Sequence, residues 1–297
     1  MSVDIYGVLF AFLAGFLFAV SDVSIRVASQ RFSPSQNLVA TLVSGLPLLW
    51  AMALIVEGVP EPSRGLGLYA AAGLLHFVAG RLLFYTAIAG LGATSAAITS
   101  SPTVVISSLL AWLFLGEALS AYDALGVVLV ALAVYMAVSK PSGTPLQGVR
   151  RTVALASGIG ATFIFSITAV VVRAAGIETG APITGIAVSY TAALPVALVL
   201  ASLKNNNPPW RIQGIEARFI AVVAWAGVSV SLAQASRYLA LYMTTVANAM
   251  ILISLFPLHT LLLAHIASKR IEGETVTPKH LAAALLALTG ITLVLAT

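Results

Sequence analysis

Residues 18–26, FAVSDVSIR, recur in altered form as FSITAVVVR at residues 165–173. Both stretches begin with a phenylalanine and end with an arginine inside a long apolar run. Four further matches follow in the same order along the chain: Leu46-Pro47 with Leu194-Pro195, Arg81 with Arg237, Pro102 with Pro257, and GEALS at 116–120 with GETVT at 273–277. Five ordered matches at a nearly constant separation predict that the chain consists of two homologous halves.

The composition indicates which solvent surrounds the chain. Of its 297 residues, 60% are apolar and 8% are charged, and the mean hydropathy is +1.02. A soluble domain carries about 25% charged residues, so this chain has too few charges to cover a surface in water. We therefore expect a lipid bilayer around it. The pI near 9.7 then reflects loop residues that set membrane orientation, and no nucleic-acid partner is predicted.

Apolar runs between polar breaks predict ten membrane-spanning helices of about 20 residues each. The expected spans are 5–28, 37–56, 66–90, 93–115, 121–139, 152–174, 182–203, 217–242, 244–266 and 278–296. The predicted fold class is an all-α integral membrane protein with five helices in residues 1–139, a linker at 140–151, and five helices in residues 152–297. An odd number of helices per half inverts the second half relative to the first, which is the usual architecture of secondary transporters.

The chain resembles the EamA family of the drug/metabolite transporter superfamily, as two EamA-type repeats over nearly its whole length. The resemblance rests on Pro102 in the fourth span, LFLGEALS at 113–120, and Gly126 in the fifth span. The second copy is weaker, since GETVT lies two residues further from Pro257 and Ala283 replaces the glycine. The resemblance implies ten helices, a central polar cavity lined by both repeats, and export or exchange of metabolites. It does not specify the substrate, because members of the superfamily carry amino acids, sugars, nucleotide sugars, phosphate esters and drugs.

Four prolines fall near the middle of predicted spans. A proline inside a helix removes one backbone hydrogen bond and displaces the carbonyl four residues earlier. The bilayer centre holds no water to repair this unless a cavity provides it. Pro102 and Pro257 therefore predict a binding site or hinge at one depth in both halves, with a kink stabilised by a neighbouring helix as the alternative. Pro47 and Pro195 are interpreted as kinks, with gating hinges as the alternative.

Charges inside the predicted spans are the first candidates for function, since a charge at the bilayer centre costs about 3 kcal/mol on insertion scales. Asp22 is the acidic residue well inside a span, and Arg26, one helical turn away, could pair with it. Arg81 lies just past the middle of the third span, whereas Arg237 is nearer a helix end and could extend to the headgroups. If both arginines face one cavity, they would bind carboxylate or phosphate. In the alternative, Arg81 neutralises Asp22 or caps the carbonyls of a broken helix.

Polar side chains concentrate on the third, fourth, eighth and ninth spans, as two repeat-related pairs. Besides the two arginines, the candidates for substrate binding are His76, Tyr85, Ser100, Ser101, Gln234, Tyr238 and Asn248. Helix packing is the alternative role for the serines. Asp22 and His76 are the candidates for proton coupling, and a packing role is the alternative for the histidine. Glu117 and Glu274, at helix boundaries, are interpreted as carboxylates that specify the fold by interacting with helix N-termini.

The distribution of basic residues predicts orientation. Loops on one side hold eleven lysines and arginines, and the opposite side holds two. The positive-inside rule then places both termini on the extracytoplasmic side of the cell membrane. The resemblance to the superfamily implies the opposite orientation, because many of its members look to have cytoplasmic termini.

The predicted function is a secondary transporter, an exporter or exchanger of small polar metabolites that are anionic or zwitterionic, such as amino acids. It would work by alternating access at a central site between the repeats. The sequence contains no nucleotide-binding, metal-binding or nucleophile motif and no cysteine, so we predict no catalytic residue, metal or cofactor. The expected partners are a small-molecule substrate and the bilayer; a monomer and a homodimer both stay open. The alternatives are a non-transporting sensor or assembly subunit, and an intramembrane enzyme.

Overall fold

Helices account for nearly all of the chain that the computed structural model describes, which is residues 4–137, 149–204, 214–266 and 278–295. Most of the predicted linker and Glu274 lie outside these residues. The first half contains α1 (Ile5–Ala28), α2 (Pro34–Val56), α3 (Arg64–Gly73), the π-helix η1 (Leu74–Arg81), α4 (Leu82–Leu91), α5 (Ala93–Thr99), α6 (Thr103–Leu115) and α7 (Ala121–Ala137). The second half contains α8 (Val149–Thr179), α9 (Pro182–Lys204), α10 (Ala217–Met243), α11 (Val246–Ile253), α12 (Phe256–Ile266) and α13 (Pro278–Leu295).

The prediction of an all-helical membrane fold is confirmed, and the helix bounds follow the predicted spans closely. In the described residues, seven helical stretches are long and apolar enough to cross a membrane, and two shorter apolar helices lie at Thr103–Leu115 and Ala121–Ala133. The number of ten spans stays a prediction. The largest difference in bounds is α8, which starts before the predicted residue 152 and continues to Thr179.

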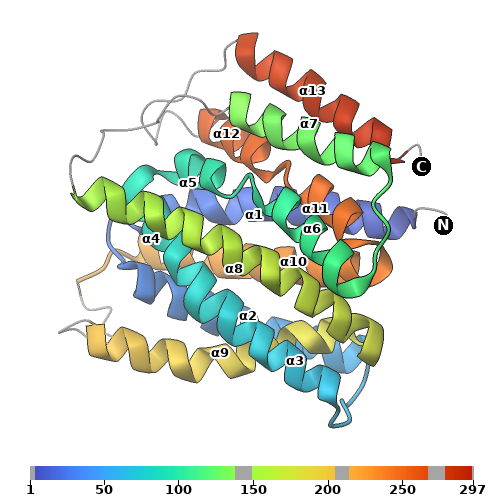
Figure 1. The fold of residues 1–297 in the computed structure, drawn as a ribbon. Helices are drawn as coiled ribbons and strands as arrows, with labels where there is room; N and C mark the ends of the chain where they lie inside the picture. Colours follow the sequence, from blue (N-terminus) through green and yellow to red (C-terminus); the bar gives the residue numbers. More distant parts are fainter. Residues whose placement is uncertain (1–3, 138–148, 205–213, 267–277, 296–297) are drawn as a thin grey trace.

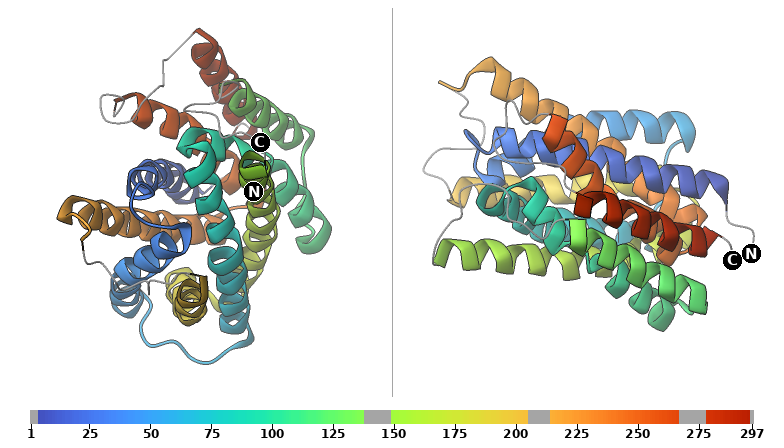
Figure 2. Two further views of the ribbon diagram at one scale, coloured as in Figure 1. Left: turned by 90° about the vertical axis from the view of Figure 1, so that its left-hand side faces the viewer. Right: turned by 90° about the horizontal axis from the view of Figure 1, so that it is seen from above.

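The helices of the two halves pack against each other in a repeated pattern. In the first half, α1 packs against α10 and α12; in the second, its repeat mate α8 packs against α4 and α6. Repeat mates also contact each other directly: α2 packs against α9, α7 packs against α13, and the two interrupted spans pack crosswise, α5 against α12 and α6 against α11. Figure 1 shows α7 and α13 together at one edge of the bundle, and it shows α1 and α8 running in opposite directions. The N-terminal end of α1 and the C-terminal end of α13 lie at the same end of the bundle (Figure 2).

The fourth and ninth predicted spans, which contain Pro102 and Pro257, are interrupted rather than kinked. Between α5 and α6 the break holds Ser100 and Ser101, and Pro102 is the N-cap residue of α6. Between α11 and α12 the break comes just before Pro257, the second residue of α12. Short backbone bonds close each break, from Ser100 N–H to the Ala97 carbonyl and from Leu258 N–H to the carbonyl of Leu255. By contrast, α2 and α9 continue without interruption through Pro47 and Pro195.

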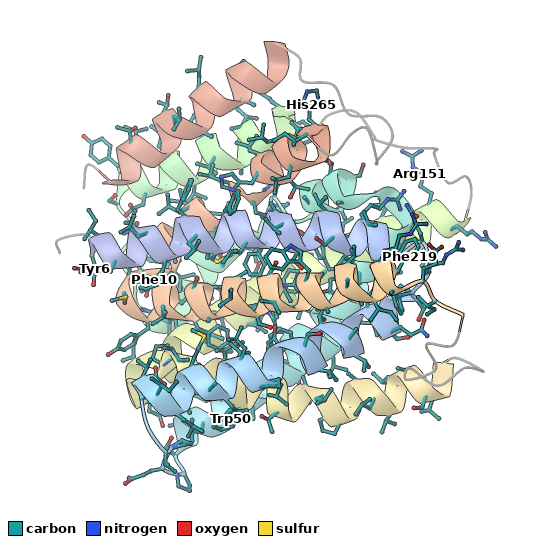
Figure 3. The ribbon with its side chains drawn as sticks, turned by 180° about the vertical axis from the view of Figure 1, so that it is seen from behind. Tyr6, Phe10, Trp50, Arg151, Phe219 and His265 are labelled. Carbon is teal, nitrogen blue, oxygen red and sulfur yellow. The ribbon has the colours of Figure 1, made fainter. Side chains whose placement is uncertain are left out.

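The outer surface of the bundle is rich in large apolar side chains. Exposed examples from five different helices are Phe12, Val43, Trp112, Trp225 and Leu262. Soluble monomers rarely expose so large an apolar area, which agrees with a bilayer as the surrounding solvent. Figure 3 shows Tyr6 at one end of the bundle and Arg151 with Phe219 at the opposite end.

Inside the bundle, glycines allow close helix contacts. Gly73 at the end of α3 faces the backbone of Ser189 on α9, and a Cβ atom added to it would overlap the Ser189 carbonyl oxygen and Cα. In the other half, Gly227 on α10 faces Thr41 and Ser44 on α2 in a related contact. Small residues at such crossings let helices in a membrane approach closely, which increases their van der Waals contact.

We predict that Gly73→Ala lowers the free energy of unfolding by about 1–3 kcal/mol, because the methyl group meets backbone that cannot move aside. Gly67→Ala on the same helix is the matched control, since nothing lies within 4 Å of an added Cβ there. Thermal unfolding of the purified proteins in detergent measures both. An unchanged melting temperature for Gly73→Ala would contradict the close packing of α3 on α9.

Candidate functional site

One cavity lies where α1, η1, α10 and the two interrupted helices meet. Its empty space, including the part that is open to the surroundings, is about 520 Å³. The polar lining residues are Asp22, His76, Arg81, Ser100, Thr103, Arg237 and Ser254. The apolar ones are Phe18, Phe84, Phe165, Met250, Ile253 and Phe256. Both halves contribute, so the cavity is a site that neither half could form alone.

The π-helix η1 places two of the polar residues on the same wall. His76 and Arg81 are five residues apart, and both line the cavity. In an α-helix, with 3.6 residues per turn, side chains five apart point about 140° away from each other. In a π-helix the hydrogen bonds join residues i and i+5, so side chains at this spacing lie nearly one above the other. The wider turn therefore brings the histidine and the arginine to one site.

Arg81 has its positive charge compensated within the site. Its Nη1 lies 3.8 Å from Oδ1 of Asp22, and the two side chains are only 5% and 1% exposed. The guanidinium also lies 5.3 Å from the ring centre of Phe18 and 5.7 Å from that of Phe165, which are repeat mates. Attraction between a cation and an aromatic ring is strongest where water is excluded. The structure thus contains the Arg81–Asp22 pair that was one of the alternatives for this arginine, and a contact of Arg81 with substrate stays a prediction.

His76 has both ring nitrogens hydrogen-bonded by side chains from the other half. Nδ1 lies 2.9 Å from Oγ1 of Thr168 on α8, and Nε2 lies 2.8 Å from Nε2 of Gln234 on α10. The Thr168 hydroxyl already donates to the Phe165 carbonyl, so it accepts the bond from Nδ1–H. The amide of Gln234 then donates to Nε2. The imidazole in this arrangement is uncharged and is held by side chains of two helices, α8 and α10.

Arg237 is the cation in the cavity that lacks such compensation. It is 3% exposed, so it does not extend to the headgroups, as the sequence had suggested it could. Its Nη1 and Nη2 have no hydrogen-bond partner among the residues that the structure describes. The aromatic ring nearest to the guanidinium carbon is that of Tyr238, 5.9 Å from its centre. A buried charge usually carries a partner, which makes this side chain exceptional.

The cavity, its position between the halves and the interrupted helices can be compared with known proteins. A profile of the EamA-like transporter family matches residues 5–139 and, a second time, residues 152–296. The chain belongs to the EamA-like transporter family. The two matches confirm the resemblance stated from the sequence, including its two repeats and its place in the drug/metabolite transporter superfamily.

Two individual comparisons agree with the EamA assignment. The "Uncharacterized transporter YwfM" of Bacillus subtilis (strain 168) is 30% identical over 143 residues, which is 47% of this chain and 47% of that protein. The match thus spans less than half the length of this curated relative. One solved crystal structure has a TM-score of 0.78 and covers 97% of this chain and 96% of its own, at 15% identity. At that identity the likeness concerns the fold alone.

The structure brings together only some of the predicted site residues of this EamA protein. Asp22, His76, Arg81, Ser100 and Arg237 line the cavity. The others lie around it or away from it. Gln234 is hydrogen-bonded to His76, and the ring of Tyr85 lies beside the Arg81 guanidinium. Ser101 is buried in the first helix break. Tyr238 stacks on Tyr69 and shares a hydrogen bond with Ser189, and Asn248 donates a hydrogen bond to Thr244 at the start of α11.

Sequence reasoning missed most of the apolar lining. In the sequence, these residues cannot be distinguished from other apolar residues of a span, because apolar side chains also face lipid and pack between helices. They are Phe84, Met250, Ile253 and Phe256. A signal did exist for two residues. Phe18 and Phe165 begin the repeated stretches, and both lie against Arg81.

Two further arginines of the repeated stretches cap helix ends. Arg26 does not pair with Asp22; its Nη1 donates to the carbonyls of Ile88 and Ala89 near the end of α4. Arg173, its repeat mate, donates from Nη1 to the Leu241 and Tyr242 carbonyls near the end of α10. The last carbonyls of a helix lack partners within it, and a cation there also interacts favourably with the helix dipole.

Glu117 completes the contacts around Arg173. Its Oε1 accepts a bond of 3.0 Å from Arg173 Nε, and its Oε2 accepts one of 2.8 Å from the backbone N–H of Val246 at the start of α11. The carboxylate thus joins the end of α6 to α8 and α11, in accord with the interpretation that it acts at a helix N-terminus. We call these two side chains the Glu117–Arg173 clamp.

We predict that Glu117→Gln lowers the free energy of unfolding by about 2 kcal/mol, below the roughly 3–5 kcal/mol measured for breaking fully buried pairs. The side chains of the clamp are 12–13% exposed. Glu216→Gln is the control, because its pair with Arg218 lies in the open at the start of α10 and such pairs contribute little. Thermal unfolding compares the two; equal losses of stability would show that the clamp is no stronger than a surface pair.

Proposed function

We propose that this EamA protein is a secondary transporter that exports or exchanges small anionic or zwitterionic metabolites, such as amino acids, across the cell membrane. The observation that carries the proposal is the cavity shared by both halves, which contains two arginines and is bordered by two interrupted helices. Interrupted helices at the junction of two repeats are typical of substrate sites in transporters. The transporter relative supports the same class of function.

The proposal includes ten spans in two inverted repeats. Counting α3, η1 and α4 as one span, and each interrupted helix as one, gives five spans per half. The opposite directions of α1 and α8 in Figure 1 support the inversion. Figure 3 places Arg151, near the start of α8, and Phe219, near the start of α10, at the end of the bundle opposite Tyr6. The basic residues Arg150 and Arg218 directly precede these two in the sequence. This supports extracytoplasmic termini by the positive-inside rule.

In alternating access, the two halves exchange roles so that the cavity opens to one side at a time. The breaks before Pro102 and Pro257 are the proposed hinges, because residues there have few helical hydrogen bonds to lose when the segments reorient. The continuous helices with Pro47 and Pro195 would bend less. Asp22 and His76 remain the candidates for proton coupling, since the first is half of a buried ion pair and the second links three helices.

Transport itself is tested with proteoliposomes that contain a mixed pool of metabolites, with the outside medium followed by mass spectrometry. We expect protein-dependent release of one class of anionic or zwitterionic compounds. Arg81→Gln should reduce this release about tenfold or more, because it leaves Asp22 buried without its counter-charge. Empty liposomes are the control. An absence of selective release, even with imposed pH or sodium gradients and substrate on the far side, would contradict the proposal and favour a sensor or an enzyme.

Alternating access is tested with single cysteines, since the natural chain contains none. We expect Ser100→Cys in the first break to react with a membrane-impermeant thiol reagent added to either side. The matched control is Leu109→Cys, because Leu109 is exposed on the outer surface of α6, where lipid should protect it. Labelling of Ser100→Cys from one side alone, in a protein that transports, would contradict the alternating mechanism.

A further inference from the structure

We propose that Arg237 is the receptor for the negative charge of the substrate, and that the cavity therefore selects monoanions with an apolar body over zwitterions and neutral molecules. The proposal rests on the proposed transport function and narrows its substrate class in the same cavity, from anionic or zwitterionic metabolites to monoanions, so that zwitterionic amino acids are disfavoured.

The first step concerns the terminal nitrogens of Arg237, which have no hydrogen-bond partner in the described part of the chain. Arg81 is paired with Asp22, and Arg26 and Arg173 are bound to helix-end carbonyls. By contrast, both terminal nitrogens of Arg237 lack a hydrogen-bond partner among the described residues, although the side chain is 97% buried. A guanidinium offers two parallel N–H groups that match a carboxylate. An anion in the cavity would supply the partner that the protein lacks.

The second step is a count of charge. Within the described part of the chain, the charged residues that line the cavity are Asp22, Arg81 and Arg237. His76 is uncharged in the assigned hydrogen-bonding arrangement. The site thus carries one positive charge in excess, and a ligand with one negative charge neutralises it. A zwitterion would bring an ammonium group as well, and the carboxylate that could receive it, that of Asp22, already faces Arg81.

The third step concerns the rest of the ligand. Four phenylalanines, with Met250 and Ile253, form the apolar walls, which suit a hydrocarbon body. Near the first helix break, the hydroxyls of Ser100 and Thr103 also line the cavity and lack hydrogen-bond partners among the described residues. They can donate to acceptor oxygens of the ligand. A compact acid with a branched or cyclic carbon skeleton therefore fits the chemistry of the walls.

The experiment uses three probes with one carbon skeleton: 4-methylpentanoate, its neutral amide, and leucine as the zwitterion. Binding to the purified full-length protein in lipid nanodiscs is measured by calorimetry. We expect the acid to bind at least about tenfold more tightly than the amide or leucine. Arg237→Gln should weaken binding of the acid about tenfold or more and leave binding of the amide unchanged. Arg237→Lys should retain part of the preference, because it keeps the charge and loses the two-pronged geometry.

Two controls separate recognition from folding. Arg218→Gln removes an exposed arginine from the same helix and should change neither binding nor stability. Arg237→Gln should keep the melting temperature of the native protein, since it removes a charge that has no described hydrogen-bond partner. A marked fall in its melting temperature would show that Arg237 is a structural residue and would overturn the proposal.

Further outcomes distinguish failure of the Arg237 proposal from failure of the proposed transport function. Equal or tighter binding of leucine would refute selection for monoanions, and acid binding that survives Arg237→Gln would refute the receptor role. Undetectable binding of the acid up to about 10 mM would also refute it. In proteoliposomes, flux that is insensitive to Arg237→Gln would retain the transporter and reject the receptor. Arg237-dependent binding without flux of any compound would retain the receptor and reject the transporter.

Discussion

A polar group within the hydrocarbon of a bilayer must find its partner in the protein, because no water is there to supply one. This constraint accounts for the position of several buried polar side chains of the bundle. Arg26 and Arg173 satisfy the carbonyls at the ends of α4 and α10. Asp22 pairs with Arg81 across two helices. His76 is held by hydroxyl and amide groups from the second half. The halves are therefore joined by polar contacts as well as by close apolar packing.

The repeat explains why a cavity forms at the centre. Equivalent segments of the two halves meet there, so each contributes a phenylalanine of its repeated stretch, an arginine and a helix break. Symmetry is nevertheless incomplete, since Asp22 has an alanine, Ala169, at the matching position. One of the two cavity arginines thus has a counter-charge and the other does not. The loss of symmetry at this single position gives the site its excess positive charge, while the remainder of the repeat keeps the two-sided architecture.

The fold was largely predictable from the sequence, because hydrocarbon demands long apolar helices and the chain marks their ends with polar residues. The breaks were foreseeable too, since proline cannot donate the missing bond. The partner of Asp22 was not predictable from the sequence. Arg26 lies one turn away on the same helix, but Arg81 reaches the carboxylate from another span, and only packing decides between them. Nor does any local pattern predict that η1 is a π-helix, since its shape depends on the contacts of its neighbours.

The form of η1 has a consequence for comparing this protein with its relatives. A π-turn holds more residues than an α-turn, so a relative whose third span lacks one residue there would continue as an ordinary α-helix. An alignment would record this as a one-residue gap between His76 and Arg81. Residues matched on either side of such a gap would still point the same way, because four residues of an α-helix turn the chain about as far as five residues of a π-turn. Substrate preference inferred from aligned site residues is therefore transferable to a relative without the extra residue only where the alignment places a gap between His76 and Arg81.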